Sequence, residues 1–242
     1  PGKMSGGYEE IIPDYKAPFI FANWNGTSGD VDVLTHECGH ALESYLAART
    51  DLPEELQCPG MESAEIHSMS MEFLTAPWHQ LFFGPDTAKY ALYHAEDSFV
   101  FLPYGCMVDE FQHIVYQNET MTPEQRNEAW LKLEQKYRPW NDFGDLGFYG
   151  RGAGWQRQLH IYECPFYYID YCLATVIALQ FFTASLSDHA DAWNRYLTLT
   201  RLAGTASYAE LAASAGMKVP FTSGSLTELA ATVSDWILDH QL

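Results

Sequence analysis

The sequence predicts a mainly α-helical protein with at most a small β element near its N-terminus. From residue 30 onward, successive stretches combine helix-forming residues with apolar residues three and four positions apart, and Gly or Pro separates these stretches. The short apolar run at residues 18–24 is the candidate strand, with a buried loop segment as the alternative. We expect residues 1–242 to form a single domain, because no internal repeat or convincing linker divides them.

The first third of the chain predicts a loop, a turn and two helices. Residues 1–17 are punctuated by Gly and Pro and are expected to form a loop. Residues 25–30 are typical of a turn with good N-capping residues, and a helix then runs to about Arg49. A second helix follows the break at Gly60 and extends to Pro77, with one buried apolar stripe.

The middle of the chain predicts two further helices. The longer one covers residues 86–117 and is expected to kink near Pro103. It carries His94 and His113, which we expect to be ordinary surface or core histidines rather than ligands. The shorter one has Pro123 at its first helical position, where proline is favoured.

The last part of the chain begins with its least helical stretch. Residues 139–154 are rich in Gly, Asn, Asp and aromatic residues, and the glycines permit positive φ angles. Residues 155–185 read as a long helical stretch that is interrupted near Pro165. Residues 188–242 read as two or three short amphipathic helices without a recognisable chemical motif.

A His-Glu-x-x-His pattern lies in the first predicted helix. His36 and His40 are one helical turn apart, so their side chains share a face and two neutral imidazoles can bind one zinc ion. Glu37 is close enough to take a proton from a zinc-bound water. The alternative is a solvated helix surface. Cys38 lies on another side of this helix and is expected to pack in the core.

A catalytic zinc needs a third protein ligand and an open position for water. In the second predicted helix, Glu65, Ser68 and Glu72 share one face. We interpret Glu65 as the third ligand and Glu72 as a carboxylate that orients a ligand histidine. Glu62 is the competitor for the ligand position, and a solvated face is the alternative for Glu72.

Several of these features occur together in one order. Glu65 follows His40 by 25 residues, in a Glu-x-x-Ser-x-x-x-Glu setting, and residues 18–27 with Asp30 precede the histidine motif. In this the chain resembles the thimet oligopeptidase and oligoendopeptidase F family of zinc peptidases. The resemblance implies a zincin-like helical catalytic domain and supports Glu65 as the ligand. Many members have a histidine three positions after the second ligand, where this chain has Glu43.

The resemblance also implies a second group of functional residues. In that family a Gly-rich loop, a histidine and a tyrosine cluster meet the substrate opposite the zinc. By order along the chain, His160 matches the histidine, and Tyr168 and Tyr171 best match the paired tyrosines. The alternative is that tyrosines at helical spacing pack in a core with their hydroxyls satisfied.

Net charge, apolar runs and cysteine spacing limit which binding partners and which cellular compartment we expect for the chain. The net charge of −19 argues against binding nucleic acid or an anionic membrane surface, and it is compatible with cationic substrates. No run reads as long and apolar enough to span a membrane. The cysteines show no paired spacing, which predicts mostly buried thiols and a cytoplasmic location.

The chain opens without a start methionine on a Gly-rich stretch. In the resembled family a similar stretch precedes the zinc motif deep inside a longer polypeptide. We therefore expect this chain to be the C-terminal, catalytic part of a longer peptidase. The N-terminal portion of the same polypeptide would then be its partner.

The sequence thus predicts a zinc-dependent endopeptidase for short oligopeptides, with one zinc per chain. His36, His40 and Glu65 would hold the zinc, and Glu37 would act as general base. A tyrosine hydroxyl or His160 would donate to the developing oxyanion. Two alternatives stay open: a carboxypeptidase-type zinc hydrolase, and a catalytically incomplete zinc-binding fragment of such a peptidase.

Overall fold

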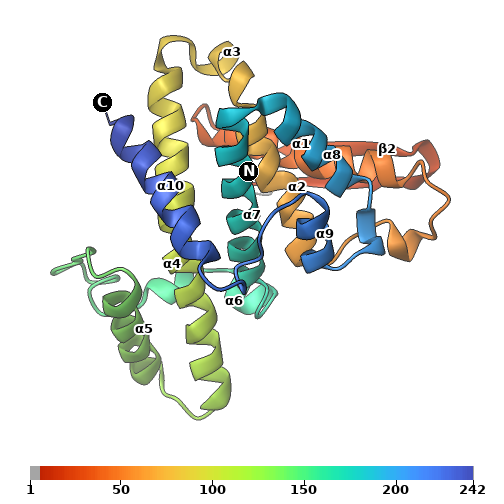
Figure 1. Cartoon of the computed structure of the whole chain (residues 1–242). Coiled ribbons are helices and arrows are strands. Elements are labelled where there is room, and N and C mark those ends of the chain that lie inside the picture. The colour runs from red at the N-terminus through yellow and green to blue at the C-terminus, as the bar shows by residue number, and fades with distance from the viewer. Residues whose placement is uncertain (1–5, 242) are drawn as a thin grey trace. The chain divides into compact units, whose positions relative to one another are not determined.

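The computed structural model describes residues 6–241 (Figure 1). The chain divides into two compact units, of which the first comprises Pro1–Phe99 with Leu173–Leu242 and the second comprises Val100–Cys172. Compact units within one chain do not always fold independently, so a single domain stays a prediction. Helices dominate both units, and a two-stranded sheet stands near the N-terminus, which confirms the predicted fold class.

The sheet pairs β1 (Gly7–Ile12) with β2 (Ala17–Ala22) in antiparallel register, so that Gly7 faces Ala22. The candidate strand is confirmed, but the loop expected before it is wrong where β1 lies. In β1 half-buried and exposed residues alternate, as in a strand with one covered face. Two adjacent glutamates, Glu9 and Glu10, break the apolar pattern there and hide the strand in the sequence.

Helices α1 (Gly29–Ala47) and α2 (Met61–Leu74) pack closely against each other. Gly39 makes this approach feasible, because a Cβ atom there would stand 2.3 Å from the carbonyl oxygen of His67. The start of α1 is fixed by Asp30, whose carboxylate accepts hydrogen bonds from backbone N–H groups of the preceding turn, at 2.6 Å from Gly26. The two helices carry the predicted ligands and end near the predicted boundaries.

Helix α2 shares a buried core with several later helices of the first unit. Fully buried residues of this core include Ile66, Ile177, Tyr196 and Leu211. Cys38 packs against it, as predicted. Three helices follow one another at the C-terminal end, which confirms the predicted short helices there. The elements are α3 (Gln80–Phe83), α8 (His189–Thr200), α9 (Tyr208–Ser214), α10 (Ser225–Asp239) and the 3₁₀ turns Glu54–Leu56, Ala76–Trp78, Gly84–Asp86 and Ala203–Thr205.

Helix α4 (Thr87–Gln117) continues through Pro103 as one element and enters the second unit. There α5 (Pro123–Tyr137) begins with a capping box, in which the Thr122 hydroxyl accepts from the backbone N–H of Gln125 and the Gln125 side chain accepts from the backbone N–H of Thr122. Both helices contribute to a core of large side chains. Its buried members are Met107, Val108, Phe111, Trp130, Leu133 and Trp155.

The stretch predicted as one interrupted helix consists of three pieces. These are a 3₁₀ turn (Gly154–Arg157), α6 (His160–Glu163) and α7 (Tyr168–Ser187). The break before α7 contains Phe166 with a φ of 66°, a conformation that cannot continue a right-handed helix. Tyr168 is therefore the first residue of α7, after the break. His160 is the first residue of α6, before the break.

Two expectations from composition need correction. Of the five free cysteines, Cys172 is buried, whereas Cys58 and Cys164 are exposed, so the thiols are not mostly buried. Among the described residues, α7 is long and apolar enough, by length and composition alone, to cross a membrane. Half of that stretch is buried inside the protein, as in the core helix of many soluble proteins, so this is weak evidence for a span.

Candidate metal centre and tyrosine cluster

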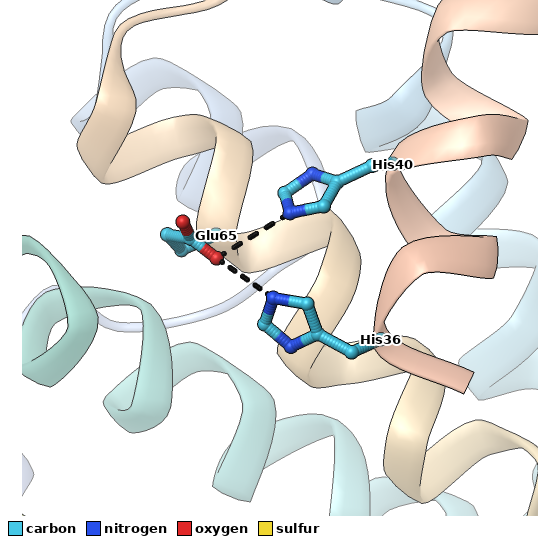
Figure 2. A group of neighbouring side chains, drawn as sticks. All are labelled: His36, His40 and Glu65. Atoms are coloured by element: carbon cyan, nitrogen blue, oxygen red, sulfur yellow. Dashed lines mark ion pairs between the residues drawn. The ribbon is translucent and has the colours of Figure 1, made fainter. Parts of the chain in front are cut away.

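Helices α1 and α2 bring three predicted ligands together (Figure 2). The Nε2 atoms of His36 and His40 lie 3.2 and 3.5 Å from Oε2 of Glu65. Three ligand atoms bound to one tetrahedral zinc at roughly 2.0–2.2 Å stand roughly 3.3–3.6 Å apart. The two separations from Glu65 therefore match a single zinc ion, and all three ligand atoms lie within 4.8 Å of one another.

The competing glutamate lies elsewhere. A Cβ atom added at Gly60 would stand 2.7 Å from Oε2 of Glu62, so that carboxylate lies against the start of α2. Glu65, one turn further along, is buried, and its Oε2 also accepts a hydrogen bond from the Ser68 hydroxyl at 2.9 Å. Of the two glutamates, Glu65 is the one placed beside the histidines.

The electrostatics of this centre favour a positive charge. Burial by itself lowers the pKa of His36, but the hydrogen bonds to Glu65 and Glu72 outweigh it and raise that pKa to about 10. Burial likewise opposes the ionised form of Glu65, but its histidine neighbours hold the pKa well below its usual range. The two carboxylates that favour a proton on His36 would equally attract a divalent cation.

Glu72 contacts His36, one of the predicted ligands. Its Oε1 lies 2.8 Å from Nδ1 of His36, which leaves Nε2 of that ring facing Glu65. A metal-binding histidine usually donates its other N–H to such a carboxylate, which fixes the orientation of the ring. These hydrogen bonds hold the pKa of Glu72 at about 2 against the effect of burial. The solvated face is excluded, because the side chain of Glu72 is 13% exposed.

His94 contacts Glu72, and the sequence did not predict this contact. Its Nε2 lies 2.7 Å from the second oxygen of Glu72, and its side chain is buried. The carboxylate of Glu72 is therefore held from two sides, by His36 and by His94. No sequence pattern pairs His94 with Glu72, because the two residues lie on separate helices and meet through tertiary packing.

Glu37 is buried on α1 beside the two histidines. Burial raises the pKa of its carboxyl, while His36 and His40 act in the opposite direction. A carboxylate with a raised pKa is a better proton acceptor at neutral pH. Strand β1 approaches this side chain closely, since a Cβ atom at Gly7 would stand 3.4 Å from Oε1 of Glu37.

Glu43 stands where many members of the resembled family have a histidine. Its side chain is buried, and its Oε1 has no hydrogen-bond partner among the described residues. Burial, helped by the nearby charge of Glu9, raises the pKa of Glu43 to about 8. This substitution therefore places a carboxyl that is mostly protonated at neutral pH one turn beyond His40.

The second unit gathers the other predicted residues. The ring centroid of His160 lies 5.0 Å from that of Tyr168 and 5.7 Å from that of Tyr171. The two tyrosine rings are 5.6 Å apart, and Tyr167 lies 4.8 Å from Tyr171. Tyr168 also packs against the core of this unit, and burial raises its pKa. Tyr168 therefore has a packing role in this cluster. The rings of His160, Tyr167 and Tyr171 are half-buried, so they are partly accessible to solvent.

Comparison with known proteins agrees with these features. Residues 1–230 match the sequence profile of peptidase family M3. The chain is 27% identical over 217 residues to oligopeptidase PepF of Bacillus subtilis, and this match covers 86% of the chain and 31% of that protein. The chain thus spans about a third of the length of that curated relative.

Solved structures give the same result for the fold. A putative oligoendopeptidase F superposes with a TM-score of 0.93 at 50% identity, covering 98% of this chain and 42% of that one. A putative oligoendopeptidase F from Bacillus anthracis str. Ames gives a TM-score of 0.86 at 43% identity, covering 100% and 40%. The predicted resemblance is confirmed, and the chain belongs to peptidase family M3.

Proposed function

We propose that this chain is the zinc-binding part of an endopeptidase that hydrolyses short oligopeptides. The spacing of the donor atoms of His36, His40 and Glu65 is the observation that carries the proposal, because it matches one tetrahedral zinc. Membership of peptidase family M3 and the names of the relatives support peptide hydrolysis.

Each residue near the centre has a separate task in this proposal. A bound zinc ion supplies a Lewis acid and lowers the pKa of its water. Glu37 accepts a proton from the attacking water and passes it to the amine that leaves. Glu72 keeps the Nε2 atom of His36 directed at the metal position.

We assign His160, Tyr168 and Tyr171 the role of hydrogen-bond donors to the substrate. Donors placed where negative charge develops accelerate acyl transfer more than donors that stabilise the ground state. The clustering of these rings supports the assignment.

A cytoplasmic location and a missing N-terminal portion belong to the same proposal. All five cysteines are free, which suits a reducing compartment. The short coverage of the relatives supports a longer natural polypeptide. Membership of peptidase family M3 supports an oligopeptide substrate. The net charge of −19 disfavours nucleic acid and anionic membranes as partners.

A catalytically incomplete zinc-binding fragment is the second candidate. The same coverage favours it, because the relatives are about three times as long as this chain. Zinc binding without peptide hydrolysis by the 242-residue chain would support this second candidate over the first.

Metal content and peptide cleavage test the proposal together. We expect one zinc per chain by elemental analysis, and a large loss in Glu65→Ala but not in the matched variant Glu62→Ala. Incubation with an amidated oligopeptide should give internal fragments, which a strict carboxypeptidase cannot produce. A wild-type chain without zinc, or Glu62→Ala losing zinc as fully as Glu65→Ala, would refute the ligand assignment.

A further inference from the structure

His160 is in hydrogen-bond contact with a glutamine that is itself anchored. Nδ1 of His160 lies 2.6 Å from Nε2 of Gln158. The other end of the same amide, Oε1 of Gln158, accepts a hydrogen bond of 2.8 Å from the hydroxyl of Tyr104. Tyr104, Gln158 and His160 are thus connected by a continuous line of two hydrogen bonds within the second unit.

The ring of Tyr104 is held firmly at the far end of this line. The guanidinium carbon of Arg138 lies 4.6 Å from the centroid of the ring, and Arg138 is fixed by two hydrogen bonds to the buried Glu134. The rings of Trp130 and Tyr168 meet the Tyr104 ring edge-on. Gln158 therefore receives its hydrogen bond from a hydroxyl whose position is set by the core of the unit.

Tyr104 also keeps its proton at neutral pH. Burial raises the pKa of the hydroxyl, although the neighbouring Arg138 acts in the opposite direction. A protonated phenol can donate, and the carbonyl oxygen of an amide can only accept. When Oε1 of Gln158 faces Tyr104, Nε2 of the amide faces His160 and donates to it.

We infer that Gln158, held by Tyr104, fixes His160 in the tautomer that carries its proton on Nε2. Nδ1 must be unprotonated to accept from the amide, so the proton of the neutral ring resides on the opposite nitrogen. Gln158 and Tyr104 are then positioning residues that act through His160. The catalytic consequence rests on the proposed function: only this tautomer presents a donor from Nε2 to a substrate oxygen.

The line of hydrogen bonds can also run in the reverse sense. If Nδ1–H of His160 donated to Oε1 of a rotated Gln158, the amide nitrogen would donate to the oxygen of Tyr104. Both arrangements keep the two hydrogen bonds of Gln158, but the first makes Nε2 of His160 a donor and the second makes it an acceptor. The position of the histidine proton is therefore the quantity to measure.

The test is nitrogen NMR of the histidine rings in the ¹⁵N-labelled full chain, with His160→Asn used to assign the resonance. We expect the wild-type ring of His160 to carry its proton on Nε2. In Gln158→Glu the carboxylate accepts from Nδ1, so a proton should move to that nitrogen. Gln156→Glu is the matched control, because Gln156 is exposed two residues before Gln158 and its substitution should leave the spectrum of His160 unchanged.

A mixture of tautomers is expected in Gln158→Leu and in Tyr104→Phe, where the line is broken at different points. Tyr104→Phe retains the aromatic ring, so it tests the hydrogen bond even if Gln158→Leu folds poorly. If the chain is active, both variants should lower kcat by roughly tenfold with little change in KM. Rescue by Gln158→Asn is not expected, because its shorter side chain cannot reach both partners.

Two results would overturn the inference: a wild-type proton on Nδ1, or an unchanged tautomer in both Gln158→Leu and Tyr104→Phe. Neither depends on turnover. A chain that binds no zinc and cleaves no peptide contradicts the proposed function but leaves the tautomer result valid. An active chain with the proton on Nδ1 contradicts this inference alone.

Discussion

The metal centre and the tyrosine cluster are supported in different ways. His36, His40 and Glu65 project from the interiors of two long helices whose backbones touch at Gly39. His160 and Tyr168 instead begin two helices on either side of a break, after a glycine-rich loop. Helix interiors fix side-chain directions through regular spacing, whereas helix starts depend on the path of the preceding loop. The first site is therefore set by two regular helices and the contact between them, and the second by loop conformation.

The largest expected effect separates chemistry from metal binding at the first site. Glu37→Gln keeps the shape of the side chain but removes its ability to accept a proton, so kcat should fall by roughly a thousandfold. The zinc content should stay at the wild-type value, because Glu37 is not among the three grouped ligands. Elemental analysis and peptide hydrolysis on one preparation check both parts. Retained activity with zinc bound would remove Glu37 from the mechanism.

A smaller loss of activity is expected at the second site. Tyr171→Phe and Tyr168→Phe, alone and combined, should lower kcat by up to roughly a hundredfold through the loss of hydroxyl donors. Zinc content should be unaffected, since the metal centre belongs to the other unit. Tyr162→Phe is a suitable control, because Tyr162 is exposed on α6. An unchanged kcat in all three variants would show that the hydroxyls of Tyr168 and Tyr171 have no catalytic role and that the two rings serve only in packing.

The hydrogen bond from His94 predicts a moderate effect on metal affinity. His94→Gln should weaken zinc binding by about tenfold, because Glu72 loses one of the two contacts that hold it against His36. Competition with a chelator measures this affinity. His113→Gln is the matched control, since His113 lies on the same helix with an exposed side chain. Equal affinities in the two variants would show that Glu72 needs no support from His94.

The last expected effect is on stability rather than on activity or metal affinity, and it depends on pH. Burial raises the pKa of Glu43 from 4.5 to about 8, so the folded chain retains a proton that the unfolded chain releases. This contribution to stability is fully present below pH 4.5 and is lost as the pH rises through about 8. Glu43→Gln should therefore raise the free energy of unfolding by about 1–3 kcal/mol above pH 8 and flatten its decline.

Urea denaturation at several pH values between these limits measures that slope. The exposed Glu55 provides the matched control, because Glu55→Gln should leave the slope as it is in the wild type. A parallel decline in wild type and Glu43→Gln would show that Glu43 is ionised in the folded chain.

The difference between side chains placed by helical spacing and side chains placed by tertiary packing explains which site residues the sequence could predict. The shared face of His36 and His40 follows from helical periodicity, and the helix face of Glu65 together with the family resemblance predicts it as the third ligand. The contact of Glu72 with His36 followed from its shared face with Glu65. The role of His94 could not be predicted, because its contact with Glu72 depends on how α4 packs against α2. Periodicity carries no information on such a meeting.

Charged residues hid one strand and one buried side chain in the sequence. Glu9 and Glu10 concealed β1, because a strand pattern is recognised by alternating apolar residues. Glu43 gave no sign of burial, since glutamate is rarely buried without a partner. The break before α7 was placed correctly near Pro165, but its length depends on the positive φ of Phe166, which the residue type does not favour.

The missing side chain at Gly39 has a consequence for the choice of metal. Because the backbones of α1 and α2 meet there without an intervening side chain, the main chains that carry the imidazoles and the Glu65 carboxylate are held close together. Main-chain contacts cannot widen by a change of rotamer to admit a larger ion. We therefore expect the predicted site to bind ions of the size of zinc or cobalt more tightly than the larger calcium ion.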